Sequence, residues 1–131
     1  MTVLVDTSAW VEFLRDTGSP VCGQVDRLLA RRITVADPVV MEVLAGARNE
    51  AHLRDLRALL GRATLQVCVS ADFLQAAALY RSCRTKGETV RKLVDCLIAA
   101  VAIRTDSPLL HADADFDVLA RHTALRVHPV A

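Results

Sequence analysis

Short apolar stretches alternate with longer segments of helical periodicity along nearly the whole of this 131-residue sequence. The apolar stretches suit strands that are buried on both faces, and the segments between them repeat apolar residues at helical spacing. Parallel strands can be joined only by a crossover, which is usually a helix and right-handed. The sequence therefore predicts an α/β fold with a parallel sheet.

Caps, prolines and glycines set the expected boundaries. Strands are expected at 3–5, 33–36, 65–69, 108–111 and 125–127. Helices are expected at 8–14, 20–32, 37–46, around 53–60, from 70 to a break at 86–88, at 93–104 and at 116–120. Ser8 is expected to cap the first helix, and 113–115 is expected to be a loop. We find no repeat or linker, so residues 1–131 are predicted to form a single domain.

Composition excludes several broad classes of protein. Apolar residues make up 53% of the chain, which excludes wholesale disorder. The net charge of +1 does not by itself require nucleic acid or membrane, and the longest apolar run, Cys96–Ile103, is too short to cross a bilayer. No signal-peptide pattern opens the chain, and its four cysteines lack zinc or redox spacing. We therefore expect a cytoplasmic protein.

Acidic residues stand where expected strands end or helices begin. Asp6 follows the first strand, Glu42 lies early in a helix, Asp95 lies near the start of the most apolar helix, and Asp113 and Asp115 follow the fourth strand. Strand carboxyl ends and helix N-termini share one edge of a parallel sheet, so these acids are expected to face one crevice. Taken singly, Asp6, Glu42, Asp113 and Asp115 are equally explained as caps, turn residues or partners of a helix dipole. Asp95 is harder to explain in this way, because its apolar neighbours imply a half-buried carboxylate, which is costly without a partner.

Several carboxylates in one crevice need a cation between them. Two of them about 4 Å apart repel by about 4 kcal/mol at an effective dielectric of 20. A set of oxygen ligands without His or Cys favours Mg²⁺ or Mn²⁺ over zinc. One or two such ions would suit the hydrolysis of a phosphodiester backbone.

Four motifs of the chain together resemble the PIN-domain ribonucleases, and among them the VapC toxins of bacterial toxin–antitoxin pairs. The motifs are Val5–Ser8, the helix with Glu42, the run Asp95–Ala100 and the segment Asp113–Phe116. The resemblance implies a three-layer α/β/α sandwich with a central parallel sheet of four to five short strands, and a Mg²⁺- or Mn²⁺-dependent endoribonuclease. It implies a catalytic quartet of Asp6, Glu42, Asp95 and Asp113, metal ligation by Asp6, Asp95 and Asp113, and supporting roles for Asp115, Thr7 and Ser8.

The resemblance also implies two protein partners. One is a second copy of the chain, and the other is a small cognate antitoxin that neutralises the toxin. We expect the antitoxin on the apolar side chains of the first two helices, such as Trp10 and Leu14. A dimer seam is expected either on the helix with Leu53, Leu56 and Leu60 or on the helix Phe73–Tyr80, because the chain has more apolar residues than one small core needs.

An acidic pocket needs basic neighbours if it is to hold RNA. A cluster just before Asp95 supplies the best candidates for phosphate contacts: Arg81, Arg84, Lys86, Arg91 and Lys92. Solvated helix and loop charges would give the same sequence pattern. Arg15 and Arg48 follow expected helices, where they would equally serve as partners of helix C-termini.

Two other functions remain open from the residues. A receiver-like phospho-acceptor domain would share the small α/β fold and the acidic Mg²⁺ pocket, but it needs an acceptor Asp after the third strand and a late Lys. This chain offers Ser70 and Asp72 there, and its last lysine is Lys92. A catalytically silent RNA-binding scaffold is the other alternative, although clustered negative charge gives such a protein no advantage beside phosphate.

Overall fold

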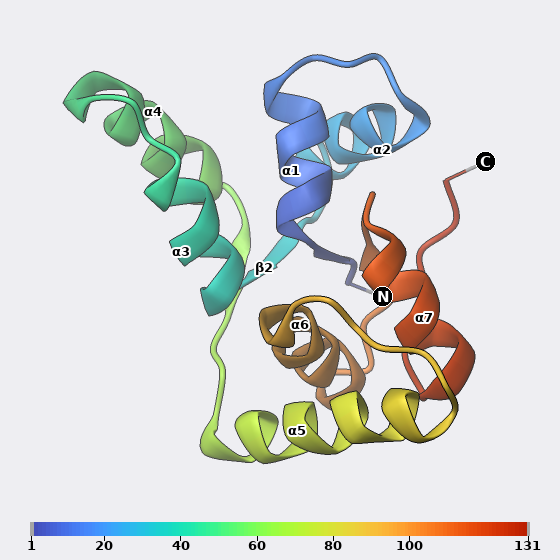
Figure 1. The fold of residues 1–131 in the computed structure, drawn as a ribbon. Coiled ribbons are helices and arrows are strands. Elements are labelled where there is room, and N and C mark those ends of the chain that lie inside the picture. Colours follow the sequence, from blue (N-terminus) through green and yellow to red (C-terminus); the bar gives the residue numbers. More distant parts are fainter. Residues whose placement is uncertain (1, 131) are drawn as a thin grey trace.

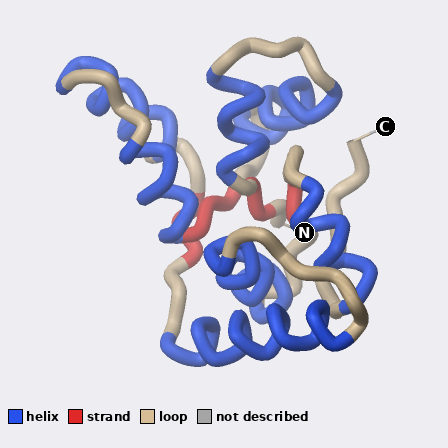
Figure 2. Tube along the Cα trace, viewed as in Figure 1, coloured by secondary structure: helices blue, strands red, loops and turns tan. Residues whose placement is uncertain are grey.

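A computed structural model describes residues 2–130 and contains one parallel sheet. Its strands are β1 (Leu4–Val5), β2 (Thr34–Ala36), β3 (Thr64–Gln66) and β4 (Leu109–Leu110), in the order β3-β2-β1-β4. Figure 2 shows these short strands in the middle of the molecule with helices around them. The predicted α/β fold with a central parallel sheet is confirmed.

Within residues 2–130, the helices cover the sheet on opposite sides (Figure 1). They are α1 (Thr7–Leu14), α2 (Pro20–Leu29), α3 (Asp37–Ala45), α4 (Glu50–Leu60), α5 (Ser70–Thr85), α6 (Leu93–Arg104) and α7 (Ala114–His122). Helices α1 and α2 lie on one side of the strands, and α5 and α6 lie on the other. None of the helices in this part of the chain is long and apolar enough to span a membrane.

Helix α6 is the buried centre of its layer. It runs over Leu93–Arg104, as its apolar sequence predicts, and it is buried at Asp95, Cys96 and every residue from Ile98 to Ala102. Helix α5 packs along it, and the fully buried Trp10 and Phe116 belong to the same core as its side chains. Burying each large apolar side chain contributes about 1.5–3 kcal/mol, so this core fixes where α6 presents Asp95.

Several local predictions were wrong. Asp6, not Ser8, is the N-cap of α1, and its side chain accepts a hydrogen bond from the Ser8 backbone N–H. The expected loop at 113–115 is the start of α7, because Asp113 caps that helix. The expected edge strand at 125–127 is reduced to a single parallel bridge between Val127 and Leu109. A short aspartate side chain can satisfy free helix N–H groups, so the acids at these turns begin helices earlier than periodicity alone suggests.

An ion pair between the buried Asp72 and the partly exposed Arg104 ties the start of α5 to the end of α6. Asp72 is 2% exposed, and its two carboxylate oxygens accept hydrogen bonds from Arg104 Nε at 2.8 Å and Nη2 at 3.0 Å. Arg104 Nη2 also donates to the carbonyl of Val67 at 2.9 Å, and the Val69 N–H donates to Asp72. The hydrogen bonds from Arg104 are the main reason why the pKa of Asp72 lies below its ordinary value.

We predict that Arg104→Met lowers the free energy of unfolding by about 2 kcal/mol at neutral pH, because it leaves Asp72 buried and ionised without its partner. A depressed carboxyl pKa stabilises the fold above the ordinary carboxyl pKa and loses that effect as the pH falls. The difference between the two proteins should therefore shrink in acid. Urea titrations at several pH values measure it, with Arg54→Met, an exposed arginine of α4, as the control. Equal stability of Arg104→Met and wild type at neutral pH would contradict the prediction.

Candidate active site

The junction of β1 and α1 brings Asp6 to the carboxyl edge of the sheet. Asp6 is only 3% exposed, and its Oδ2 accepts hydrogen bonds from Ser8 Oγ at 2.6 Å and from Ser8 N at 2.9 Å. Ser8 Oγ in turn accepts the Ala112 N–H at 2.9 Å, which ties the end of β1 to the segment after β4. Ser8 therefore supports Asp6 by orienting its carboxylate.

Glu42 reaches the same edge from α3. Thr7 Oγ1 donates to Glu42 Oε1 at 2.7 Å, although the two residues are 35 positions apart. Both line a cavity of about 290 Å³, together with Asp6, Ser8, Lys92 and Asp95. The structure thus brings three members of the predicted acidic quartet, Asp6, Glu42 and Asp95, to one cavity.

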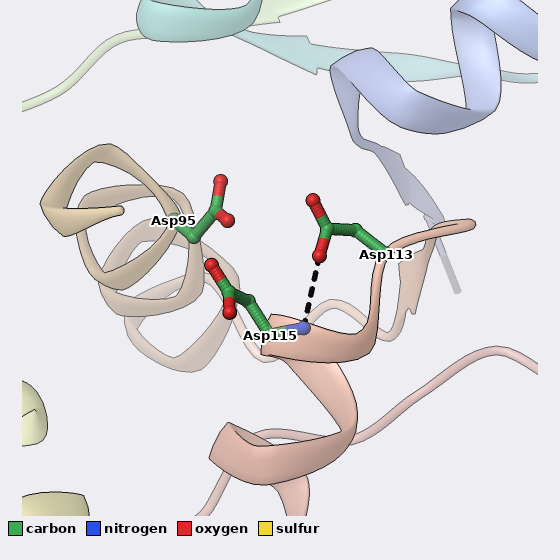
Figure 3. A group of neighbouring side chains, drawn as sticks. All are labelled: Asp95, Asp113 and Asp115. Atoms are coloured by element: carbon green, nitrogen blue, oxygen red, sulfur yellow. Dashed lines mark hydrogen bonds between the residues drawn. The ribbon is translucent and has the colours of Figure 1, made fainter. Parts of the chain in front are cut away.

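The fourth member, Asp113, lies close to Asp95 in a group of three carboxylates that also includes Asp115. Asp95 on α6 and Asp113 and Asp115 at the start of α7 each offer a carboxylate oxygen, and these oxygens all lie within 4.8 Å of one another. Figure 3 shows the three carboxylates converging, with Asp113 Oδ1 accepting the Asp115 N–H at 2.9 Å. Asp115, which is 2% exposed, is as much a part of this group as Asp113.

Arg91 and Lys92 neutralise part of this negative charge. Arg91 donates from Nη2 to Asp113 at 2.7 Å and from Nε to Asp115 at 3.1 Å. Lys92 Nζ lies 3.2 Å from Asp113 Oδ2 and 3.8 Å from Asp95 Oδ2. The backbone N–H groups of Arg91 and Lys92 also donate to Asp115. These two residues were predicted as phosphate contacts, and the structure shows them paired with the acids.

The other three predicted phosphate contacts lie elsewhere. Arg81 and Arg84 are exposed on α5, and Lys86 is exposed at its C-cap. Arg84 lies over the ring of Tyr80, 5.6 Å from its centroid. Among residues 2–130, no hydrogen bond or ion pair joins these three basic side chains to the acidic group. Contact of these side chains with RNA stays a prediction.

The acids differ strongly in proton affinity. Burial, a hydrogen bond to Asp115 and the charge of Asp6 raise the pKa of Asp95 to about 8. Burial also raises the pKa of Asp6. For Asp113 and Asp115 burial is outweighed by hydrogen bonds, including those from Lys92 and Arg91 respectively, so that both pKa values are lowered. A proton on Asp95 and the two basic side chains therefore keep this group of carboxylates together.

The donor set fits a hard divalent cation. Asp6 Oδ1 and Asp95 Oδ2 are buried and have no hydrogen-bond partner within the described residues. Buried carboxylate oxygens are normally satisfied, and within the described residues the one cation near either atom is Lys92, whose Nζ lies 3.8 Å from Asp95 Oδ2, so both atoms are placed to bind a divalent ion. All the converging ligand atoms are carboxylate oxygens, which Mg²⁺ and Mn²⁺ prefer, and the cavity leaves room for the waters that Mg²⁺ retains.

The sequence matches a known family of protein domains. Residues 3–122 match the PIN domain, and the chain belongs to this family.

Within that family the chain belongs to the VapC ribonucleases. It is 48% identical over 128 residues to Ribonuclease VapC11 of Mycobacterium tuberculosis strain H37Rv, covering 95% of this chain and 96% of that protein. The same values hold for VapC ribonuclease Mb1587 of Mycobacterium bovis. The resemblance seen in the sequence motifs is confirmed.

Solved structures show the same fold at low sequence identity. VapBC2 from Rickettsia felis, bound to a DNA fragment from its promoter, superposes with a TM-score of 0.79 at 19% identity, covering 98% of both chains. VapBC-1 from nontypeable Haemophilus influenzae superposes with a TM-score of 0.77 at 18% identity, covering 99% of this chain and 98% of that one.

We predict that without divalent metal the protein becomes less stable as the pH rises from about 5 to about 8. Asp95 keeps its proton in the folded state up to about pH 8, whereas in the unfolded chain it ionises near pH 4. Over this interval the folded state therefore binds one more proton than the unfolded state, so the free energy of unfolding falls as the pH rises, by on the order of a few kcal/mol in total.

Asp95→Asn should remove most of this decline and be no less stable than the wild type near pH 8 in EDTA. Melting temperatures across this pH range measure it, with Asp55→Asn, an exposed acid on α4, as the matched control. A fall of several degrees for Asp95→Asn relative to wild type near pH 8 would show that the acids do not strain the metal-free site.

Proposed function

We propose that the protein is an endoribonuclease toxin that hydrolyses RNA phosphodiester bonds with Mg²⁺ or Mn²⁺ and is neutralised by a cognate antitoxin. The observation that carries this proposal is the convergence of Asp6, Glu42, Asp95 and Asp113 from four separate segments, with Asp6 Oδ1 and Asp95 Oδ2 buried and accepting no hydrogen bond within the described residues. The ribonuclease names of the 48% identical relatives support the same reaction.

The acids would have different roles according to their positions in the site. Asp6, Asp95 and Asp113 would hold one or two ions, with Asp115 beside them. A bound divalent ion lowers the pKa of water and stabilises charge on the leaving oxygen. Thr7 occupies Glu42 Oε1 and so fixes this carboxylate at the cavity wall, where Glu42 takes a proton from the attacking water. Lys92, half-exposed at the rim, neutralises negative charge next to the scissile phosphate.

We expect Asp6→Asn and Asp95→Asn each to reduce RNA cleavage by at least about a hundredfold, because each removes a charge that the metal requires. Gel assays on purified protein with Mg²⁺ or Mn²⁺ measure this, and EDTA should abolish the wild-type activity. Asp55→Asn should cleave like wild type. Full cleavage by both site variants, or by wild type in EDTA, would disprove the mechanism.

The structure argues against a receiver-like phospho-acceptor domain. Asp72, the acid after the third strand, is buried and paired with Arg104, so it cannot take a phosphoryl group without breaking that pair. The silent RNA-binding scaffold differs from the nuclease in one outcome, because it binds RNA without cutting it in the assay above.

The protein also exposes an apolar face that suits a second copy of the chain. Phe73 is 59% exposed, Leu74 78% and Leu93 63%, and Met41 of α3 is 62% exposed beside them. A hollow between α3, α5 and α6 is lined by both Met41 and Phe73. A second hollow shares Met41 with it and a third shares Phe73, so the three apolar hollows lie next to one another. Of the two expected dimer seams, the face with Phe73 is therefore favoured. On α4, Leu56 and Leu60 are buried inside the chain.

We predict that Phe73→Glu with Leu74→Glu converts a homodimer into a monomer, because it places two like charges in the seam of each subunit. Light scattering after size exclusion measures the mass. Ala51→Glu, an exposed position of α4, should leave the dimer intact. A dimer that survives the double substitution would place the seam elsewhere.

For the antitoxin we keep the surface of α1 and α2. The structure buries Trp10 and Val25 completely but leaves Leu14 42% exposed at the end of α1. A partner helix would reach this surface through Leu14 and its half-buried neighbours, such as Phe13 and Leu28.

A further inference from the structure

A second cavity adjoins the acidic one. It has a volume of about 370 Å³ and is lined by apolar side chains of α1, α3 and α4 together with Arg15, Arg48 and His52. The two cavities share Thr7, Val11 and Glu42 as lining residues, so they lie next to each other on the two sides of these residues. Whatever binds over the acids can extend past the Thr7–Glu42 pair into this second space.

The turn between α3 and α4 holds two polar groups of this cavity in place. Asn49 caps α4 by accepting the His52 N–H at 2.8 Å. His52 Nδ1 accepts the Arg48 N–H in return, at 3.0 Å. Since Nδ1 is an acceptor here, the neutral ring carries its proton on Nε2 and offers a donor. The same reciprocal pair fixes the backbone from which the Arg48 side chain extends.

The cations of the second cavity are available to a ligand. Among residues 2–130, no carboxylate lies within 4.0 Å of the guanidinium of Arg15 or Arg48, whereas Arg91 and Lys92 are paired with the catalytic acids. Arg15 serves as the C-cap of α1 through its backbone N–H, which leaves its exposed side chain unused. An unpaired arginine presents a planar fork of donors that matches phosphate.

We propose that this second cavity binds the nucleotide next to the scissile phosphate. Arg15 and Arg48 bind its phosphate, the apolar wall of Val11, Leu14 and Leu56 packs against the base, and His52 donates a hydrogen bond from Nε2. The cavity is within the size range of small-ligand sites and combines apolar walls with a few polar groups. The proposal rests on the ribonuclease function and adds to it a place where part of the substrate is recognised.

A nucleotide fits this space better than a peptide for two reasons. The cavity shares Thr7, Val11 and Glu42 with the site proposed to hold the phosphodiester, so a neighbouring nucleotide of the same strand can reach it. Its two arginines outnumber its one carboxylate, Glu42, which Thr7 holds at the edge shared with the acidic cavity, and the substrate is a polyanion. A peptide of the antitoxin is the competing occupant, and the experiment below separates the two.

The test measures binding of a short fluorescein-labelled single-stranded RNA by anisotropy, in EDTA and at low salt. Arg15→Gln and Arg48→Gln should each weaken binding by about three- to tenfold. Each should also make the salt dependence of log K shallower by about 0.7, the value for one phosphate contact on a single strand. The matched control is Arg54→Gln on α4, an exposed arginine that lines neither cavity.

Cleavage kinetics provide the second measurement. The arginine variants should raise KM several-fold and leave kcat nearly unchanged, because they remove binding remote from the reacting atoms. His52→Gln keeps an acceptor for the Arg48 N–H and should change the preference among bases more than the affinity. The subsite would be disproved if the wild type cleaves RNA and the arginine variants have the same KM and salt dependence as Arg54→Gln. The proposed nuclease function would then still stand.

Two further outcomes are also decisive. If the arginine variants bind and cleave RNA normally but lose inhibition by the cognate antitoxin, the cavity is a peptide groove and the proposal is wrong. If wild type cleaves no RNA with either metal, the proposed function fails, and the anisotropy result then decides by itself whether the second cavity binds nucleotides.

Discussion

Repulsion among carboxylates at one rim of the sheet is the constraint that the rest of the structure must satisfy. Asp6, Asp95 and Asp115 are each nearly inaccessible to solvent. Such a group is stable only if something replaces the lost water. Three different devices do so: Ser8 donates twice to Asp6, the segment of Arg91 and Lys92 donates to Asp113 and Asp115, and burial leaves a proton on Asp95.

The same acids also build the helices that carry them. Asp6 caps α1 and Asp113 caps α7, so each carboxylate faces free N–H groups and the positive end of a helix dipole. An acid of the candidate site at a strand end therefore also stabilises the fold. The apolar α6 has no side-chain cap and places Asp95 in its first turn, where packing of the buried face fixes the position. Local capping and core packing thus converge on one geometry.

The sequence predicted the parts of this geometry that depend on local patterns. Both ends of the helix Leu93–Arg104 were predicted correctly. Its burial was predicted because the helix is apolar nearly all round. The convergence of Asp6, Glu42 and Asp95 followed from strand ends and helix starts sharing one edge. The pairing of Arg91 with Asp115 could not be predicted, since 24 positions separate them and either residue alone is typical of a solvated surface. The cap of α1 was predicted wrongly because Asp6, two residues before Ser8, accepts the Ser8 N–H, while Ser8 Oγ is used by Asp6 and by the Ala112 N–H, a contact 104 positions away that no local pattern predicts.

Distance along the chain was a poor guide to which cations are free. Arg91 and Lys92 come just before Asp95 in sequence, yet Arg91 pairs with the distant Asp113 and Asp115, and only Lys92 lies near Asp95 as well as Asp113. Arg15 follows α1 and Arg48 lies in the turn before α4, and they line the same cavity because α1 packs against α3. Under the proposed function, a polyanionic substrate needs cations that the acidic group does not already neutralise. The fold places such cations apart from the acids, with the Thr7–Glu42 pair between the cavity of the acids and the cavity of Arg15 and Arg48.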